Sequence, residues 1–163
     1  RRNGRAPQVL AGVGFTSQGD HYGAPYRRTP ESYSNEWAWV FEGITEEIIG
    51  DFGLSGGGAA GFELDRADTM LGTPLNAVTL ASSEGHDDSF VLVPEDILTH
   101  HDTWPHKPLK DLIRADIVYF ETAKGGGVFS VGSITFCGSL PHNNCENNIS
   151  KMVENVIRKF LSN

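Results

Sequence analysis

The sequence has little cysteine, few basic residues and no long apolar run, and each scarcity argues against a class of protein. Only Cys137 and Cys145 occur, which speaks against a disulfide framework and favours a reducing, cytoplasmic location. Thirteen Lys and Arg oppose 21 Asp and Glu, and the resulting net charge of -8 disfavours nucleic acid as a partner. No apolar run approaches the roughly 20 residues that span a bilayer, so no membrane partner is expected.

What the sequence does contain is a foldable core and an excess of glycine. The hydrophobic fraction of 39% is too high for a disordered chain, and 163 residues predict a single domain, residues 1–163, with its own core. Residues 1–8 are polar and show no periodicity before an apolar run begins at Val9. We therefore expect the chain to be a C-terminal fragment of a longer one. The 19 glycines cluster, most densely at residues 50–61.

Helical periodicity is clearest at the end of the chain. Apolar residues recur at helical spacing from Ile149 to Leu161, which predicts an amphipathic helix that Asn143 and Glu146 cap. Elsewhere short apolar or alternating runs predict strands at residues 9–15, 76–82, 115–121 and 127–137, a helix at 91–98 and a loop at 19–35. Residues 36–44 fit a strand or a helix, and a strand followed by a turn is favoured. Together these elements predict an α/β fold, with a parallel or mixed sheet flanked by helices.

The glycine-rich segment precedes two carboxylates, Glu63 and Asp65. Glycine lets a backbone approach a ligand and adopt positive φ, so this segment can set both carboxylates at the floor of a pocket. A desolvated Glu63 would have a raised pKa and could act as a base or nucleophile. The alternative is an acidic surface turn paired with Arg66. Ser55 also lies in a G-x-S-x-G pattern, but the glycines after it are too many for the helix that a serine-hydrolase elbow requires.

Two further clusters carry reactive side chains. Glu84 and His86 follow an apolar run, and side chains beyond the carboxyl end of such a strand are well placed for acid or base work in open α/β sheets. A polar turn is the equally simple interpretation of this segment. The side chains that could bind a metal are Cys137, His142 and Cys145, and, in an expected loop, His100, His101, Asp102 and His106. They are too few and too irregularly spaced for a metal site, so no metal ligand is assigned in this chain.

Several blocks of sequence point to a family. They are GDFGL at 50–54, GGGAAGFELDR at 56–66, LGTP at 71–74, ASSEGH at 81–86, RADIVYF at 114–120, VFSVGSI at 128–134, CGSL at 137–140, NNIS at 147–150 and RKFL at 158–161. In order and across nearly the whole chain, they resemble the C-terminal part of the large (beta) subunit of bacterial N,N-dimethylformamidase.

The resemblance implies hydrolysis of a small formamide or other amide to a carboxylate and an amine. It also implies a fold like that of class I glutamine amidotransferases, and an iron enzyme that assembles as a homo-oligomer with a small subunit. The family's iron ligands, two tyrosines and a glutamate in a His-x-Glu stretch, belong upstream, and no His-x-Glu occurs here. The residue that matches the family's pocket glutamate is Glu63, which makes it the expected catalytic residue, with Asp65, Glu84 and His86 as pocket or supporting residues.

Two functional hypotheses follow. In the first, the chain contributes Glu63 to an amide-hydrolysing iron site that an upstream domain completes, so that the isolated fragment binds no iron and is inactive. In the second, the chain is a non-catalytic structural or assembly module of a related protein. A serine hydrolase that uses Ser55 is a weaker third hypothesis. The sequence leaves the physiological substrate open.

Overall fold

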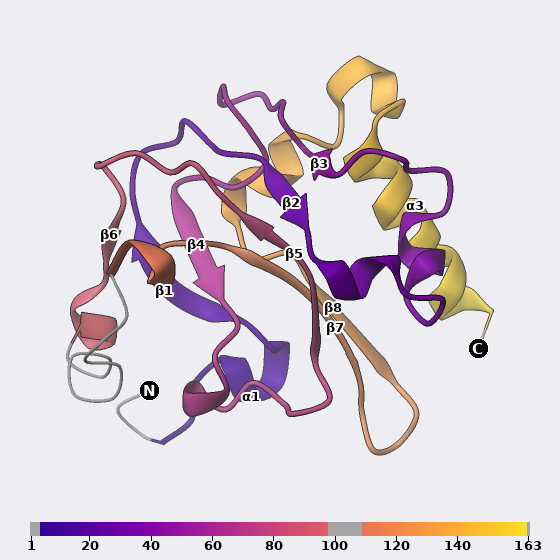
Figure 1. Cartoon of the computed structure of the whole chain (residues 1–163), viewed down its shortest axis with the longest axis horizontal. Coiled ribbons are helices and arrows are strands. Elements are labelled where there is room, and N and C mark those ends of the chain that lie inside the picture. The colour runs from indigo at the N-terminus through magenta and orange to yellow at the C-terminus, as the bar shows by residue number, and fades with distance from the viewer. Residues whose placement is uncertain (1–3, 98–108, 163) are drawn as a thin grey trace.

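The computed structural model describes residues 4–97 and 109–162, which form two antiparallel β-sheets and few helices (Figure 1). The smaller sheet has the order β4-β1-β6, and its strands are β4 (Glu63–Arg66), β1 (Gly14–Gln18) and β6 (Val91–Leu92). The larger has the order β3-β2-β5-β7-β8, and its strands are β3 (Ile48–Ile49), β2 (Tyr26–Arg28), β5 (Val78–Ser83), β7 (Asp116–Glu121) and β8 (Gly127–Ser130). The expected histidine loop, 100–106, lies outside the described residues.

The predicted α/β fold with a parallel or mixed sheet flanked by helices is wrong, and so is the fold like that of class I glutamine amidotransferases that the resemblance implied. Every pairing between the named strands is antiparallel. Parallel neighbours need a crossover of a dozen or more residues, usually a helix, whereas antiparallel strands can be joined by a tight turn. Residues 122–126 make such a turn between β7 and β8. The misleading signal is β7, in which residues 117–120 are apolar and all buried, the kind of run that is typical of a parallel strand.

The predicted C-terminal helix is confirmed as α3 (Asn148–Leu161), but its cap is different. The side chain of Asn147, not Asn143, accepts a hydrogen bond from the Ser150 N–H at 2.8 Å. Of the two residues that were expected to cap it, Asn143 lies in the 3₁₀ turn η6 (His142–Cys145), where Asn143 and Asn144 have positive φ, and Glu146 directly follows that turn. The pattern of apolar residues located the helix, whereas the choice of cap depended on the turn before it.

Several other segments differ from expectation at their ends. Strands β5 and β7 confirm the predictions for 76–82 and 115–121. Residues 9–15 instead begin as the short helix α1 (Gln8–Ala11), which ends at Gly12 with φ of 78° before β1 starts. The predicted strand 127–137 stops at Ser130, and the expected loop 19–35 contains β2. The remaining 3₁₀ turns are η1 (Pro30–Tyr33), η2 (Ala38–Phe41) where a strand was expected, η3 (Thr69–Leu71), η4 (Leu109–Leu112) and η5 (Ile134–Gly138).

Both sheets and α3 share one hydrophobic core. Its members include Tyr26 on β2, Leu64 on β4, Ile117 on β7 and Met152 on α3, all of them 0% exposed. Burial of this apolar surface drives the sheets together and positions β4 against the larger sheet. In the part of the chain that the structure describes, no helix has the length and apolar character needed to cross a membrane.

Candidate functional site

The two predicted carboxylates of the glycine-rich motif lie on strand β4. Burial alternates along the strand, so Leu64 and Arg66 are buried while Glu63 and Asp65 are half-buried on the opposite face. Within residues 4–97 and 109–162, the Glu63 carboxylate makes no hydrogen bond or ion pair. A half-buried carboxylate without a protein partner is available to accept a proton or a hydrogen bond from a ligand.

The glycines before Glu63 pack against another backbone segment rather than lining an open floor. A Cβ at Gly57 would lie 2.0 Å from the carbonyl oxygen of Gly23, and one at Gly23 would lie 2.1 Å from that of Gly58. Ala24 and Ala60 exchange hydrogen bonds of 2.7 and 3.0 Å between their backbone groups. The glycines are therefore required for backbone contact, and this contact holds the segment that leads into β4.

Strand β4 begins directly after a strained residue, Phe62. Phe62 has φ of 61°, and the Glu63 N–H donates to the Gly61 carbonyl at 2.8 Å, the hydrogen-bond pattern of a γ-turn. The Phe62 N–H donates to Asp20 O at 2.7 Å, and the Phe62 carbonyl accepts from the Gly19 N–H at 2.9 Å. The Phe62 ring stacks on His21 at 4.2 Å between centroids and 16° between planes. Backbone and ring contacts together hold the residue directly before Glu63.

The other two predicted residues line a separate cleft of about 500 Å³ at the end of β5. The residues lining it are Ser83, Glu84, Gly85, His86, Asp87, Asp88, Phe90, Lys110, Asp111, Ile113 and Arg114. Glu63 and Asp65 are not among them. The structure thus places the four predicted residues in two groups, Glu63 and Asp65 on β4, and Glu84 and His86 on the cleft.

Glu84 is engaged by an arginine. Arg27 on β2 donates to both of its carboxylate oxygens, from Nε at 2.8 Å and from the NH2 nitrogen at 2.7 Å, and also pairs with Glu47. The hydrogen bonds from Arg27 lower the pKa of Glu84, so it is ionised at neutral pH. A carboxylate held in this way is suited to fixing the position of β2 against β5 rather than to transferring protons.

His86 pairs with Ser83 across the base of the cleft. Ser83 Oγ lies 2.7 Å from His86 Nε2 and accepts the Ala115 N–H at 2.8 Å. Burial lowers the pKa of His86 to about 4, against the opposing charge of Asp87, which keeps the ring neutral at pH 7. The other ring nitrogen, Nδ1, is buried and has no hydrogen-bond partner among the described residues. The arrangement resembles a serine–histidine pair, but Ser83 is only 5% exposed.

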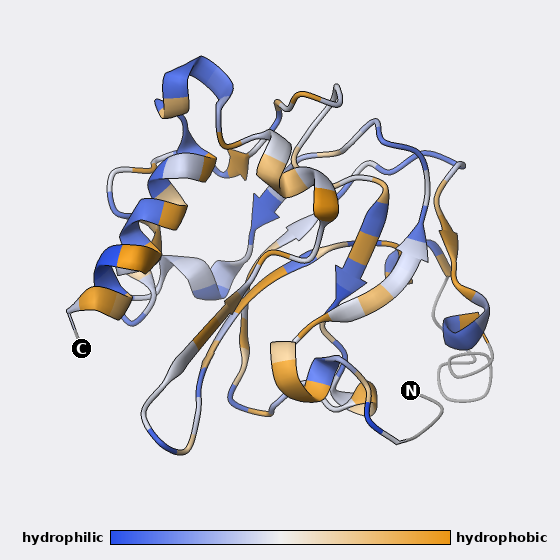
Figure 2. Cartoon of the chain, turned by 180° about the vertical axis from the view of Figure 1, so that it is seen from behind, coloured by the Kyte–Doolittle hydropathy of each residue, from blue (hydrophilic) through white to orange (hydrophobic). Residues whose placement is uncertain are grey.

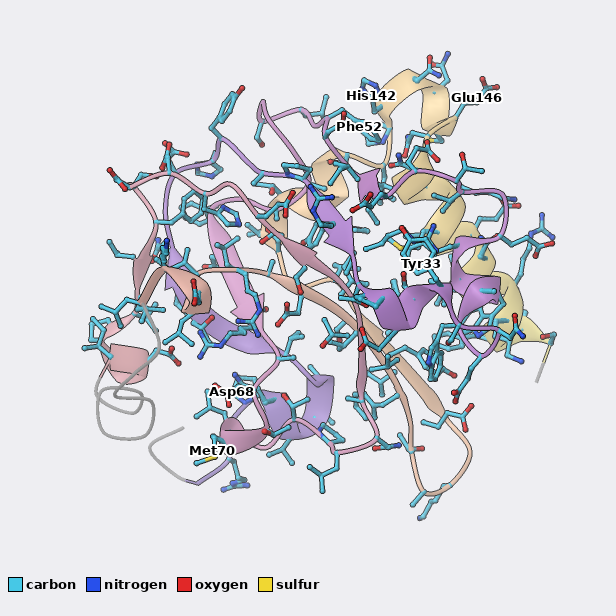
Figure 3. The ribbon with its side chains drawn as sticks, in the orientation of Figure 1. Tyr33, Phe52, Asp68, Met70, His142 and Glu146 are labelled. Atoms are coloured by element: carbon cyan, nitrogen blue, oxygen red, sulfur yellow. The ribbon has the colours of Figure 1, made fainter. Side chains whose placement is uncertain are left out.

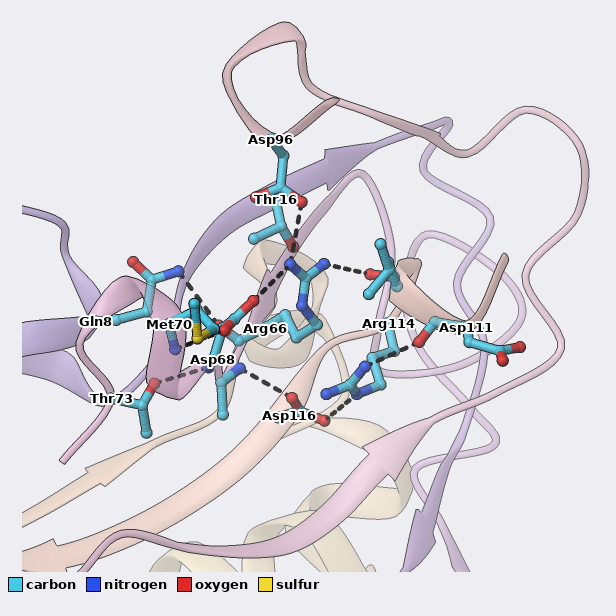
Figure 4. A network of polar contacts seen from close by, with 12 residues as sticks. Gln8, Thr16, Arg66, Asp68, Met70, Thr73, Asp96, Asp111, Arg114 and Asp116 are labelled. Atoms are coloured by element: carbon cyan, nitrogen blue, oxygen red, sulfur yellow. Dashed lines mark hydrogen bonds and ion pairs between the residues drawn. The ribbon is translucent and has the colours of Figure 1, made fainter. Parts of the chain in front are cut away.

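A buried polar network behind the cleft was not foreseen. Asp116, at the start of β7, accepts hydrogen bonds from Arg114 Nε at 3.0 Å and the Ala67 N–H at 2.9 Å (Figure 4). It also accepts one from Ser82 Oγ at 2.6 Å. Burial, and then the negative charges of Asp116 and Asp65, raise the pKa of Tyr26, whose hydroxyl donates to Val131 O at 2.6 Å. The network joins the two sheets at the end of β4, where Ala67 donates to Asp116 on β7. Its only sequence signal is the Arg-x-Asp spacing at 114–116.

The remaining candidate residues do not converge on a site. Ser55 is exposed in a turn, and no helix follows it before β4, so the strand-turn-helix context of a nucleophile elbow is missing. Cys137 and Cys145 are exposed free thiols, and His142 stacks on Phe52 at 4.2 Å (Figure 3). Among the described residues, no three His, Cys, Asp or Glu side chains gather as metal ligands would.

Comparison with known proteins gives a consistent match. Residues 1–147 match the family described as N,N-dimethylformamidase beta subunit-like, C-terminal. Among curated proteins, the chain is 43% identical over 99% of its length to the N,N-dimethylformamidase beta subunit of Alcaligenes sp, and 43% identical over the same share to that of Paracoccus aminophilus. The chain spans only 21% of the length of each relative.

Proposed function

The chain belongs to the N,N-dimethylformamidase beta subunit-like family, and we propose that it is the part of an amide hydrolase that supplies the carboxylate of Glu63 to the reaction. The substrate class is a small formamide or similar amide, which yields a carboxylate and an amine. The observation that carries the proposal is the Glu63 carboxylate, half-buried on β4 and without a partner among the described residues. The 43% identity over 99% of the chain supports it.

Glu63 has the chemistry of a general base. Water attacks the amide carbonyl carbon as its proton passes to the Glu63 carboxylate, and the C–N bond then breaks as the nitrogen takes up that proton and leaves as an amine. General-base catalysis requires a carboxylate within hydrogen-bond reach of the water and held in place. Strand β4, the Phe62 turn and the glycine contacts supply that rigidity. Asp65, on the same face, acts as a supporting carboxylate.

The chain acts as one part of a larger enzyme. We propose that any iron used in the reaction is held by ligands elsewhere in the longer polypeptide; in support, no three His, Cys, Asp or Glu side chains gather as metal ligands would among the described residues. Partner subunits are proposed because the relatives are named as beta subunits. Glu84 and His86 are assigned a structural role at the β5 end, since Arg27 and Ser83 already engage them.

The test uses the full-length protein with N,N-dimethylformamide as the probe and amine release as the measurement. Glu63→Gln should lower kcat by about 10² to 10⁴-fold, the range of general-base catalysis. Metal content and Tm should stay unchanged. The matched control is Glu121→Gln, an exposed glutamate at the end of β7, which should retain full activity. If Glu63→Gln retained near wild-type activity, the catalytic role would be lost and the chain would be a structural module of its enzyme.

A further inference from the structure

A β-bulge in strand β1 places one amide side chain beside Glu63. Strands β1 and β4 lie side by side (Figure 2), and in their register Gln18 is opposite Glu63. Phe15 is opposite Asp65, and the register shifts between residues 15 and 17. Residues three apart in a regular strand point to opposite faces, so the shift is what brings Gln18 and Phe15 to the face of the two carboxylates. Bulges that redirect a side chain in this way are common next to active sites.

Gln18 and Glu63 are close neighbours because they form a non-hydrogen-bonded pair of the antiparallel ladder. The Gly19 N–H donates to the Phe62 carbonyl at 2.9 Å, so the backbone hydrogen bond lies beside the pair rather than within it. In such pairs the Cα atoms are about 4.5 Å apart and the side chains stand closest together. Gln18 also pairs with Val91 of β6, so its backbone is held between two strands.

The Gln18 carboxamide has the hydrogen-bond donors that the Glu63 carboxylate lacks. An ionised carboxylate only accepts hydrogen bonds, whereas a glutamine side chain also has two N–H donors. Gln18 is exposed, and within residues 4–97 and 109–162 its carboxamide has no hydrogen-bond partner. Phe15, the other residue that β1 places on this face, has no polar atom in its side chain. Since the Gln18 and Glu63 side chains do not bond to each other, a single ligand can contact both.

We propose that Gln18 is a further catalytic residue, which binds the carbonyl oxygen of the amide while Glu63 acts on the water; this inference rests on the proposed function of Glu63. As water adds to the carbonyl carbon, an electron pair of the C=O bond moves onto the oxygen, and the Gln18 Nε2–H donates a hydrogen bond to that oxygen. Gln18 neither gains nor loses a proton, because the proton of the water passes to Glu63 and then to the departing nitrogen. An N,N-disubstituted amide has no N–H, so its carbonyl oxygen is the atom that a protein donor can bind.

The experiment measures kcat and KM of the full-length protein with N,N-dimethylformamide as the probe. Gln18→Met removes the donor but keeps the length of the side chain, and it should lower kcat by about 10² to 10³-fold, the range for loss of one donor to a developing oxyanion. The matched control is Asn35→Met, which removes an exposed amide elsewhere in the chain and should retain full activity. Tm should be unchanged in both variants.

Gln18→Glu tests whether residue 18 lies beside Glu63 in the working enzyme. The substitution keeps the shape of the side chain but puts a second carboxylate next to Glu63. The acid limb of the kcat/KM–pH profile should therefore move to higher pH, because a neighbouring like charge makes ionisation of the base less favourable. In Gln18→Met, which adds no charge, the acid limb should stay where it is in the wild type.

Failure of this inference can be told apart from failure of the proposed function. Wild-type kcat in Gln18→Met, or an unmoved acid limb in Gln18→Glu, would overturn the role of Gln18 and leave Glu63 as the base. A lower kcat in Gln18→Met together with a shifted acid limb would also overturn it, because Gln18 would then act through Glu63 and not on the substrate. Retained activity in Glu63→Gln would instead refute the proposed function itself.

Discussion

At the scale of single residues, Phe62 has the most unusual conformation next to a proposed functional group. A non-glycine residue with φ of 61° is strained, and strain of this kind persists only where surrounding contacts impose it. Here the contacts are two backbone hydrogen bonds to residues 19–20 and the stack on His21. The strain therefore fixes the direction in which Glu63 leaves the turn.

Glycine usually lowers the stability of a protein relative to alanine, but the strain at Phe62 predicts the opposite order at this position. Phe62→Gly should be more stable than Phe62→Ala by about 1 kcal/mol, because glycine adopts positive φ without the steric cost that a Cβ brings. At Glu42, which is exposed with φ of -58°, the order should reverse and alanine should be the more stable substitution. Urea unfolding of the four variants measures both differences. The same order at both positions would contradict a strained turn at Phe62.

At the scale of elements, a buried arginine joins strand β4 to segments far from it in sequence. Arg66 is 1% exposed, and its guanidinium donates to Leu112 O at 2.7 Å, Asp68 at 3.1 Å and Asp96 at 3.0 Å (Figure 4). These contacts connect β4 to η4 and to the segment after β6. A buried ion pair contributes little net stability when intact, but loss of one partner leaves a buried charge without compensation.

Two arginine substitutions test this difference between a buried and an exposed ion pair. Arg66→Met should lower the free energy of unfolding by about 3 to 5 kcal/mol, because it leaves buried carboxylates with one partner fewer. Arg27→Met removes an equally well-formed but exposed pair to Glu84 and should lower the free energy of unfolding far less than Arg66→Met, because water screens an exposed ion pair. Denaturant unfolding gives both values. A similar cost for both variants would show that burial of the Arg66 network has no energetic consequence.

At the scale of the whole molecule, net charge and the burial of His86 change the stability of the fold in opposite directions as pH falls. The net charge of -8 moves toward zero near the isoelectric point of about 5.1, which reduces self-repulsion. His86 opposes this trend. Its pKa is about 4 in the folded state and 6.5 when unperturbed, so the unfolded chain binds more protons across that window. Stability from His86 is present above pH 6.5 and is lost as pH falls toward 4.

Replacing His86 should make the free energy of unfolding less dependent on pH in the acid range. Wild-type protein should lose about 1 to 2 kcal/mol between pH 6.5 and 4.5 relative to His86→Gln, allowing for solvent screening of a partly exposed ring. His142→Gln, on an exposed turn, should follow the wild-type curve. The measurement is urea unfolding across this pH range. If His86→Gln and wild type lost stability in parallel, the low pKa of His86 would be refuted.

The sequence predicted some parts of this molecule well for identifiable reasons. The helix at 149–161 followed from a periodicity that repeats over several turns, and strands β5 and β7 followed from long apolar runs. The short elements were not predictable, because helix α1 and the 3₁₀ turns depend on local stops such as Gly12. Glu63 and Glu84 were identified as candidates from motif alone. The motif could not show that Arg27, 57 positions away in sequence, engages Glu84.

The sequence by itself determined composition, charge, the terminal helix and membership of a family, because each depends on the identity or order of residues. Only the tertiary structure decided how the strands pair, since a buried antiparallel strand and a buried parallel strand have the same apolar run. It also decided that the glycines contact backbone, that Glu84 is paired, and that Glu63 has no partner among the described residues. These are contacts between residues far apart in the chain, and no local pattern encodes them.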